Sequence, residues 1–284
     1  MHIVVCIKQV PDSAQIRVHP VHNTIMRQGV PTIINPYDLF ALEEALRLRD
    51  KFGGEVTALC MGPMTAEDSL RKALTFGADR AVLLSDRYFA GSDTLATSYA
   101  LSMALEHIGR EFGVPDIVFT GKQTIDGDTA QVGPGIAKRL KYNQLTYISR
   151  IVEADFEAGT IRVERRAEGG VQVLETKLPV LITMLEATNE MRRGSIESAL
   201  AAAKAKVHVW NAAAVGIEDL TKCGLRGSPT IVKKVFAPGA RSEKAAQLPV
   251  DGAPEAIAQA AIDAIFARLP GIEAQLFEMA AQPY

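Results

Sequence analysis

The stretch that decides the fold is IVFT at residues 117–120, followed by GKQTIDGDTAQVGPGIA at residues 121–137. The apolar run predicts a short buried strand. Gly127, which stands between two aspartates, is the residue expected to adopt a positive φ in the turn. Asp128 and Gln131 are spaced like a capping box, which predicts a helix running to about Leu140. Together these features predict an anion site, because unpaired N–H groups and the helix dipole point at one spot.

Gly133-Pro134-Gly135 is unusual inside the predicted helix. Pro134 lacks a backbone donor and is expected to kink the helix. Poor helix formers at this point are understandable if a bulky ligand must approach the backbone closely. An ordinary α/β turn would have a similar sequence, so both interpretations stay open.

Three further buried strands are predicted upstream, at residues 2–10, 55–61 and 80–84. Helices are predicted at 36–52, 66–76 and from 94 to about 112, with Asn35 and Ser92-Asp93 as caps and Pro36 at the first helical position. A small hairpin is expected at 16–18 and 24–26, with its turn near 21–23. Alternating strands and helices with short loops predict an α/β fold with a doubly wound, mostly parallel sheet. Residues 6–8, 60–62 and 121–122 end three of these strands and are expected to converge.

From Tyr147 onward the pattern changes to period two. Residues 148–154, 160–166 and 171–176 predict antiparallel strands added to the sheet, and 179–183 predict one more buried strand. A polar loop at 189–196, an Ala-rich helix at 198–206 and an irregular stretch follow. We expect four parts: a core at 1–190, a loop and helix at 191–206, completion of the core at 207–239, and a linker with a C-terminal helical arm at 240–284. The arm's helical segments, expected at 255–269 and 272–279, would pack on another subunit or fold back on the surface.

Composition excludes several classes of protein. The net charge is −2, and no apolar run approaches the ~20 residues that span a bilayer. Three distant cysteines and the absence of a signal-peptide pattern predict a reducing, cytoplasmic setting without disulfides. Catalytic and metal motifs are missing, and Glu43-Glu44 is interpreted as a solvated helix face rather than acid/base machinery. Any catalysis would therefore depend on a cofactor.

Several motifs spread over nearly the whole chain resemble the β subunit of electron-transfer flavoproteins. They include CIKQV at 6–10, NPYD at 35–38, MGP at 61–63, LRKAL at 70–74, GADR at 77–80 and GKQ at 121–123. The family signature also fits residues 163–183, with Arg165, Gln172 and Pro179. The resemblance implies an adenine-nucleotide α-hydrolase-like fold. It also implies a heterodimer with an electron-transfer flavoprotein α subunit that holds one FAD.

The resemblance also implies a nucleotide site in this chain. Its residues would be Cys6, Asn35, Pro36, Tyr37, Asp38, Met61, Gly121, Lys122, Gln123, Thr124, Ile125, Asp126, Gly127, Asp128, Thr129, Ala130, Gln131 and Val132. Mitochondrial members hold AMP there and carry a loop that reads roughly DDDxxQTG. This chain reads DGDTAQVGPG at 126–135 and resembles the Fix-type and electron-bifurcating group, whose β subunit holds a second FAD. Gly127 and 133–135 would leave space for the larger ligand, although AMP and FAD share the adenosine and phosphate contacts.

In bifurcating members, NADH delivers a hydride to the β-subunit flavin. One electron then passes to ferredoxin or flavodoxin, and the other passes through the α-subunit FAD to a quinone oxidoreductase or an acyl-CoA dehydrogenase. The protein positions the flavin and sets its potential. The opening motif and residues 37–42 resemble the nitrogen-fixation-linked subfamily most. The alternative within the family is a subunit that holds AMP and only shuttles electrons.

The family's partner-recognition loop corresponds to residues 189–206, with Ile196 in the place of its anchoring leucine. An exposed apolar tip flanked by charges suits docking, whereas a side chain folded onto its own domain is the alternative. The lysine cluster of mitochondrial members is reduced to Lys204 and Lys206, which favours the membrane quinone oxidoreductase over an acyl-CoA dehydrogenase. A hypothesis from a different class is a universal-stress-type ATP-binding regulatory module, which shares the sheet architecture and would need no α subunit.

Overall fold

A computed structural model describes residues 1–12, 17–18, 25–26, 31–233, 247, 252–269, 271–272 and 275–276. The chain divides into two compact units, Met1–Ala237 and Pro238–Tyr284. None of the helices in these described ranges is both long and apolar enough to cross a membrane.

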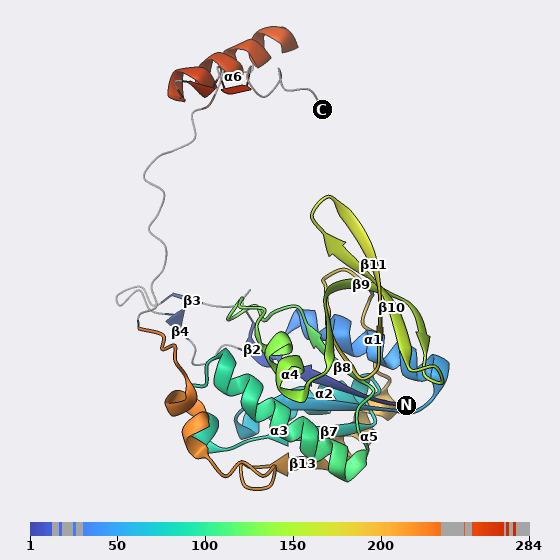
Figure 1. The fold of residues 1–284 in the computed structure, drawn as a ribbon. Helices are drawn as coiled ribbons and strands as arrows, with labels where there is room; N and C mark the ends of the chain where they lie inside the picture. The colour runs from blue at the N-terminus through green and yellow to red at the C-terminus, as the bar shows by residue number, and fades with distance from the viewer. Residues whose placement is uncertain are drawn as a thin grey trace. The chain divides into compact units, whose positions relative to one another are not determined.

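The first unit is built on a nine-stranded sheet in the order β11-β10-β9-β12-β8-β1-β6-β7-β13. Figure 1 shows β9, β10 and β11 side by side at one end of this sheet. The strands from β12 to β13 are parallel, β9 joins β12 in parallel, and β10 and β11 add antiparallel hairpins. The strands of this sheet are β1 (His2–Ile7), β6 (Glu55–Met61), β7 (Arg80–Leu84), β8 (Ile117–Gly121), β9 (Asn143–Asp155), β10 (Thr160–Ala167), β11 (Gly170–Lys177), β12 (Val180–Met184) and β13 (Val207–Trp210). The predicted α/β class and mostly parallel sheet are confirmed.

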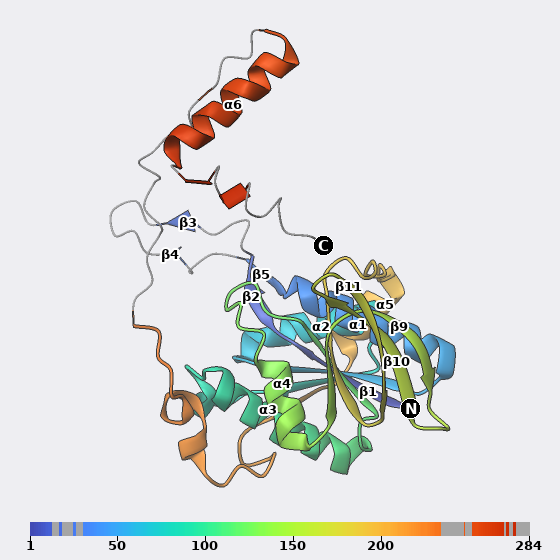
Figure 2. The ribbon, with the colours of Figure 1, turned by 45° about the horizontal axis from the view of Figure 1, so that its top comes forward.

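Helices cover both faces of the sheet (Figure 2). They are α1 (Pro36–Phe52), α2 (Glu67–Phe76), α3 (Thr94–Phe112), α4 (Val132–Leu140) and α5 (Ile196–Lys204), with short 3-10 helices at Met64–Ala66, Arg87–Phe89, Leu220–Lys222 and Gly224–Gly227. Buried side chains of α1, α2 and α5 share one core with one face of the sheet, and those of α3 and α4 share the other. Along β1, Ile3 and Val5 face the first core while Val4 faces the second, as expected for a strand covered on both sides.

The topology places a switch point between β1 and β8. From β1 the chain adds β6 and β7 on one side, and then returns to place β8 on the other side of β1. In open α/β sheets, ligands bind in the crevice at such a point, beyond the carboxyl ends of the strands. We therefore expect a ligand site at the carboxyl ends of β1 and β8.

The first predicted strand, 2–10, is shorter than expected. It is interrupted at Lys8, whose backbone N–H donates to the Asp38 carboxylate at 2.8 Å instead of continuing the ladder. The chain then forms β2 (Gln9–Pro11), which pairs with β5 (Thr32–Ile34) in a separate two-stranded sheet. The predicted hairpin is present as β3 (Arg17–Val18) and β4 (Ile25–Met26), and its turn lies outside the described residues.

Two predictions about the C-terminal third need comment. The Ala-rich helix begins at Ile196 rather than 198, because the Ser195 hydroxyl accepts a hydrogen bond from Ser198 N–H and caps the helix earlier. The second unit contains α6 (Pro254–Arg268), as predicted for its first helical segment. Most of the predicted linker and of the segment at 272–279 lies outside the described residues, so packing on another subunit stays a prediction.

Candidate functional site

A cavity of about 820 Å³ lies at the switch point, where the ends of β1, β6 and β8 meet. The prediction that these three strand ends converge is confirmed. The cavity is lined by Cys6, Ile7, Lys8, Asp38, Met61, Gly62, Pro63, Ser85, Asp86, Arg87, Phe89, Ala90, Gly91, Ser92, Asp93, Thr94, Thr97, Leu101, Thr120, Gly121, Lys122, Gln123, Thr124, Gly127, Thr129, Ala130, Gln131, Val132 and Gly133. Its size is at the upper end of the roughly 300–1,000 Å³ usual for small-molecule sites.

Asp38, in the first turn of α1, joins two of these strand ends. Its carboxylate accepts hydrogen bonds from Lys8 N–H at 2.8 Å and from Gly121 N–H at 3.0 Å. Burial raises the pKa of Asp38 to about 7, although these N–H donors favour the charged form. Asp38 therefore ties the end of β1 to the end of β8 at the floor of the cavity.

Gly121 permits the close approach of α1 to β8. A Cβ at this position would lie 2.6 Å from Asp38 Oδ1, from Tyr37 C and from Tyr37 Cβ. Two of these atoms belong to the backbone or are attached directly to it, so they cannot turn away. Gly121 is needed for the packing that forms the site, whatever ligand occupies it.

Asn35 has a role other than the predicted one. It precedes α1 and Pro36 takes the first helical position, but the Asn35 side chain makes no capping bond. Instead, its amide donates to Gln123 O at 2.9 Å and accepts from Ile125 N–H at 3.2 Å. The side chain is fully buried, and through its donor and its acceptor it fixes the loop that follows β8.

The loop after β8 differs from the prediction in two respects. The residues with positive φ are Asp128, at 51°, and Ala130, at 55°, whereas Gly127 is not among them. The predicted capping box is also wrong, because α4 begins at Val132 after Gln131, which makes no side-chain capping bond. The Asp128 carboxylate instead accepts a hydrogen bond from Gln123 Nε2 at 2.7 Å, inside the loop.

The Gly-Pro-Gly sequence is explained by packing rather than by a kink or a ligand. Pro134 lies in the first turn of α4, where its missing N–H would have had no partner within the helix. A Cβ on Gly133 would lie 2.9 Å from Thr120 Oγ1, and one on Gly135 would lie 2.8 Å from Ser98 Cβ. The space beside both glycines is therefore taken up by protein, which removes one reason for expecting the larger ligand.

The N-terminus of α4 is the best anion-binding feature in the cavity. Val132 and Gly133 line the cavity, and their N–H groups have no hydrogen-bond partner among the described residues. The neighbouring α3 is different, because Asp93 accepts hydrogen bonds from Leu95 N–H and Ala96 N–H. Free N–H groups and the helix dipole favour a negative group before α4.

The charged side chains around the cavity are mostly paired. Lys8 Nζ lies 2.8 Å from Asp126 Oδ1, and Lys122 Nζ lies 2.9 Å from Glu186 Oε2. Burial opposes ionisation of Asp126, but the Lys8 ammonium outweighs it and lowers the Asp126 pKa. Within the described ranges, Arg87 is the lining cation that forms no ion pair, and its guanidinium lies against the Tyr88 ring and hydroxyl. Arg87 is therefore free to meet an anionic ligand.

The predicted site residues fall into two groups. Those that line the cavity are Cys6, Asp38, Met61, Gly121, Lys122, Gln123, Thr124, Gly127, Thr129, Ala130, Gln131 and Val132. Those that do not are Asn35, Pro36, Tyr37, Ile125, Asp126 and Asp128. Asn35 and Asp126 instead support the loop through the contacts described above, and Tyr37 lies under the Lys122 ammonium at 4.9 Å.

One wall of the cavity, formed by residues 85–87 and 89–94 with Thr97 and Leu101, was not predicted. It follows β7 and leads into α3, next to the strands whose ends were predicted to meet. The sequence contained one signal, the Ser92-Asp93 cap, but that signal marks a helix and does not place it beside the cavity. Thr94 Oγ1 donates to Gln131 Oε1 at 2.9 Å and so connects this wall to the loop before α4.

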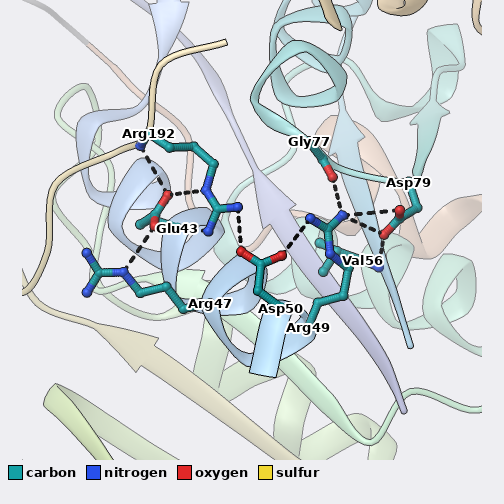
Figure 3. Close-up of polar contacts among 8 residues, drawn as sticks. All are labelled: Glu43, Arg47, Arg49, Asp50, Val56, Gly77, Asp79 and Arg192. Carbon is teal, nitrogen blue, oxygen red and sulfur yellow. Dashed lines mark hydrogen bonds and ion pairs between the residues drawn. The ribbon is translucent and has the colours of Figure 1, made fainter. Parts of the chain in front are cut away.

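Ile196 lies away from the cavity, at the first position of α5. Its side chain is 78% exposed, and Leu200, four residues later on the same face, is 59% exposed. The segment before it is held to α1 by ion pairs between Arg192 and Glu43 (Figure 3). The interpretation of Glu43 as part of a solvated face is wrong, since its side chain is only 5% exposed and is paired.

Comparisons with known proteins identify the family of the chain. A family model described as "Electron transfer flavoprotein domain" matches residues 22–215. Protein FixA of Azorhizobium caulinodans is 71% identical over 280 residues, which cover 99% of each chain, and Protein FixA of Azotobacter vinelandii is 63% identical over 281 residues, which cover 99% of this chain and 100% of that one. The electron transfer flavoprotein subunit beta of Clostridium acetobutylicum is 47% identical over 234 residues, which cover 82% of this chain and 87% of that one. The chain therefore belongs to the electron transfer flavoprotein family, as a β subunit of its Fix group.

Proposed function

We propose that the cavity binds FAD and that the chain works as the β subunit of an electron-bifurcating flavoprotein. The observation that carries this proposal is the cavity of about 820 Å³ with the free N-terminus of α4 in its wall. FAD contains the whole of AMP together with a second phosphate, a ribityl chain and an isoalloxazine ring. A cavity of this size is larger than an AMP molecule alone requires.

The lining residues suit such a ligand. The free N–H groups of Val132 and Gly133, with the unpaired Arg87, would hold the pyrophosphate. The side chains of Met61, Phe89 and Leu101 offer apolar surface for ring systems. When bound, FAD would supply the exchange between two-electron and one-electron transfer that the side chains lack.

The acidic side chains on the cavity wall do not prevent anion binding, because backbone donors compensate them. Asp38 accepts from two N–H groups, and Asp86 accepts from Tyr88 N–H and Ala212 N–H, both at 3.1 Å. Asp93 caps α3 and also accepts from Thr230 N–H at 3.1 Å. These carboxylates connect elements of the fold. The charge of Asp86 and Asp93 is largely satisfied there, and burial favours the neutral form of Asp38 by raising its pKa to about 7.

The identity of the nucleotide is tested by extracting and quantifying the cofactors of the heterodimer purified after co-expression with its α subunit. Two FAD per heterodimer would support the proposal. One FAD and one AMP would refute it and favour a subunit that only shuttles electrons. A flavin-free chain that is stable and binds ATP alone would favour the universal-stress-type module instead.

The role of Arg87 gives an independent test of the cavity as the site. Arg87→Gln removes the charge and leaves a shorter, neutral polar side chain. A charge-assisted hydrogen bond contributes about 1.5–3 kcal/mol, so nucleotide affinity should fall roughly ten- to a hundredfold. Arg193→Gln, far along the chain on an exposed segment, is the matched control and should leave the affinity unchanged.

Family membership supports an α-subunit partner, and the other partners are part of the proposal. We expect a heterodimer with an electron-transfer flavoprotein α subunit, hydride transfer from NADH, and electron delivery to ferredoxin or flavodoxin and to a membrane quinone oxidoreductase. The strong similarity to FixA proteins supports a role in nitrogen fixation. We also propose a cytoplasmic location. Anaerobic mixing of the heterodimer with NADH tests this scheme. Reduction of ferredoxin or flavodoxin only when a quinone acceptor is also present would support bifurcation, and reduction without that acceptor would refute it.

Docking of the quinone oxidoreductase is assigned to α5. Ile196 and Leu200 present adjacent apolar side chains to solvent, and an apolar anchor surrounded by polar residues is typical of binding hot spots. Ile196→Ala should weaken binding to the oxidoreductase without changing the nucleotide content. Unchanged binding would exclude α5 as the docking element.

A further inference from the structure

We propose that Arg192 is the positioning residue of this docking surface: it fixes the segment that leads into α5 and so holds Ile196 and Leu200 ready to enter an apolar depression on the partner. The inference rests on the docking role proposed above and adds a residue that does not itself need to touch the partner. The docking surface is defined here as Ile196 and Leu200 of α5.

The central contact is a fork between Arg192 and Glu43 of α1 (Figure 3). Arg192 Nε donates to Glu43 Oε2 at 2.9 Å, and Arg192 Nη2 donates to Glu43 Oε1 at 3.2 Å. The backbone N–H of Arg192 also donates to Glu43 Oε2 at 3.1 Å. Both the side chain and the main chain of Arg192 are thereby fixed to one buried carboxylate. Bidentate geometry of this kind defines orientation as well as distance.

The fork continues into a chain of alternating charges. Arg192 Nη1 donates to Asp50 Oδ2 at 2.7 Å, and Arg49 Nη2 donates to Asp50 Oδ1 at 3.0 Å. Arg49 reaches Asp79 at 3.1 Å, and Asp79 accepts from Val56 N–H at 2.8 Å. Figure 3 shows this sequence of contacts running from the segment before α5 across the end of α1. Arg192 is thus connected to the central sheet and not only to a surface helix.

Two further contacts restrain the same segment. Asn189 Nδ2 donates to Phe40 O at 3.0 Å and to Glu44 Oε2 at 3.3 Å, both on α1. Gly194 passes so close to α2 that a Cβ would lie 2.5 Å from Thr75 Cγ2 and 2.7 Å from Thr75 O. The segment from Asn189 to Gly194 therefore has few alternative conformations. Within this segment, Arg192 forms the ion pair with α1.

The other end of α5 is held separately. Arg71 of α2 donates to Ala202 O at 2.8 Å and to Ala203 O at 3.1 Å, at the C-terminal end of α5. Ala202 is buried against the core, whereas Ile196 and Leu200 are exposed. A short helix with both ends fixed loses little conformational entropy when it binds, and such preorganisation raises affinity. This explains how two exposed apolar side chains can form a specific docking surface.

The two exposed side chains determine what the partner must offer. Their apolar surface requires a complementary apolar depression, and the partner to which we assign it is the membrane quinone oxidoreductase. Arg192 is half-buried and engaged with Glu43 and Asp50, so it is not available to pair with that partner. Its effect on binding should therefore act through Ile196.

The test is a double-mutant cycle in the co-expressed heterodimer. Binding to the purified, detergent-solubilised quinone oxidoreductase is measured for Arg192→Ala, Ile196→Ala and the double variant. Arg192→Ala should weaken binding about tenfold, within the range found for coupled residues. In the Ile196→Ala background the same change should have almost no further effect. Arg193→Ala is the matched control, because this neighbouring arginine is exposed and has no ion pair within the described ranges; it should leave binding within a factor of two or so.

Folding is checked by flavin content and by the rate of reduction of a small dye, which needs no docking; both should match the wild-type heterodimer. If Arg192→Ala does not fold, Arg192→Lys keeps the charge but cannot form the fork, and it should weaken binding to a smaller extent. Additive effects in the cycle, or an Arg192 variant that binds normally, would overturn the positioning role. Normal binding by Ile196→Ala would instead show that the proposed docking function itself is wrong.

Discussion

Replacing Gly121 by alanine tests whether the close contact between α1 and β8 forms the site. The added methyl group would lie 2.6 Å from Asp38 Oδ1, from Tyr37 C and from Tyr37 Cβ. Ordinary van der Waals contact begins at 3.4 Å, so relief requires a shift of 3.4 − 2.6 = 0.8 Å. The φ of Gly121 is not in the left-handed region, and the cost therefore comes from contact rather than from backbone strain.

The size of the effect follows from the rigidity of the neighbours. Tyr37 C belongs to the backbone of the first turn of α1. The Asp38 carboxylate is held by the hydrogen bonds that it accepts from the backbone N–H groups of Lys8 and Gly121. Overpacking in such surroundings costs about 1–3 kcal/mol, and we expect the upper end because α1 must move as a unit. For a unit of this length, 3 kcal/mol corresponds to a decrease in Tm of about 6–12 °C.

Thermal unfolding of the co-expressed heterodimer, followed by far-UV circular dichroism, measures this decrease. Gly127→Ala is the matched control in the same loop, since its Cβ would meet only the Thr124 hydroxyl, at 3.3 Å. Gly121→Ala should also lower the nucleotide content, because the hydrogen bonds through which Asp38 joins the ends of β1 and β8 would break. A Gly121→Ala heterodimer with the Tm of the wild type would refute the packing explanation.

Three other substitutions have defined outcomes. The pKa of Asp38 is raised to about 7 in the folded protein, above the unfolded value of about 3.9. The contribution of Asp38 to the free energy of unfolding is therefore fully present below pH ~4 and is lost as the pH rises to ~7. Asp38→Asn should remove this pH dependence, which denaturant titrations at several pH values measure. Asp93→Ala removes the α3 cap and the contact to Thr230, and should cost about 1–2 kcal/mol by equilibrium unfolding. Pro134→Ala should change the free energy of unfolding by less than about 1 kcal/mol, since an interior kink would instead involve about 3 kcal/mol.

Most of the fold could be predicted because its signals are local. The apolar runs of β6, β7 and β8 and the stripe of α1 follow from the period of the side chains along strand and helix. Pro36 and Asp93 mark helix starts through backbone geometry and capping, which neighbouring residues determine. Some errors occur where a distant partner competes with a local preference, as when Asn35 leaves its capping role to bond Gln123 and Ile125. Others are local, as where Ser195 caps α5 so that it begins two residues before the predicted start.

The sequence by itself determined the order of strands and helices and, through motifs that resemble a known family, the kind of protein. Only the tertiary structure decided which side chains share the cavity wall and that Glu43 pairs with Arg192, 149 residues away. The physical reason is that secondary structure depends on spacing along the chain, whereas a site depends on contacts between segments that the chain brings together. For the same reason, no local pattern indicates that Gly133 and Gly135, in the first turn of α4, leave room for the side chains of Thr120 and Ser98.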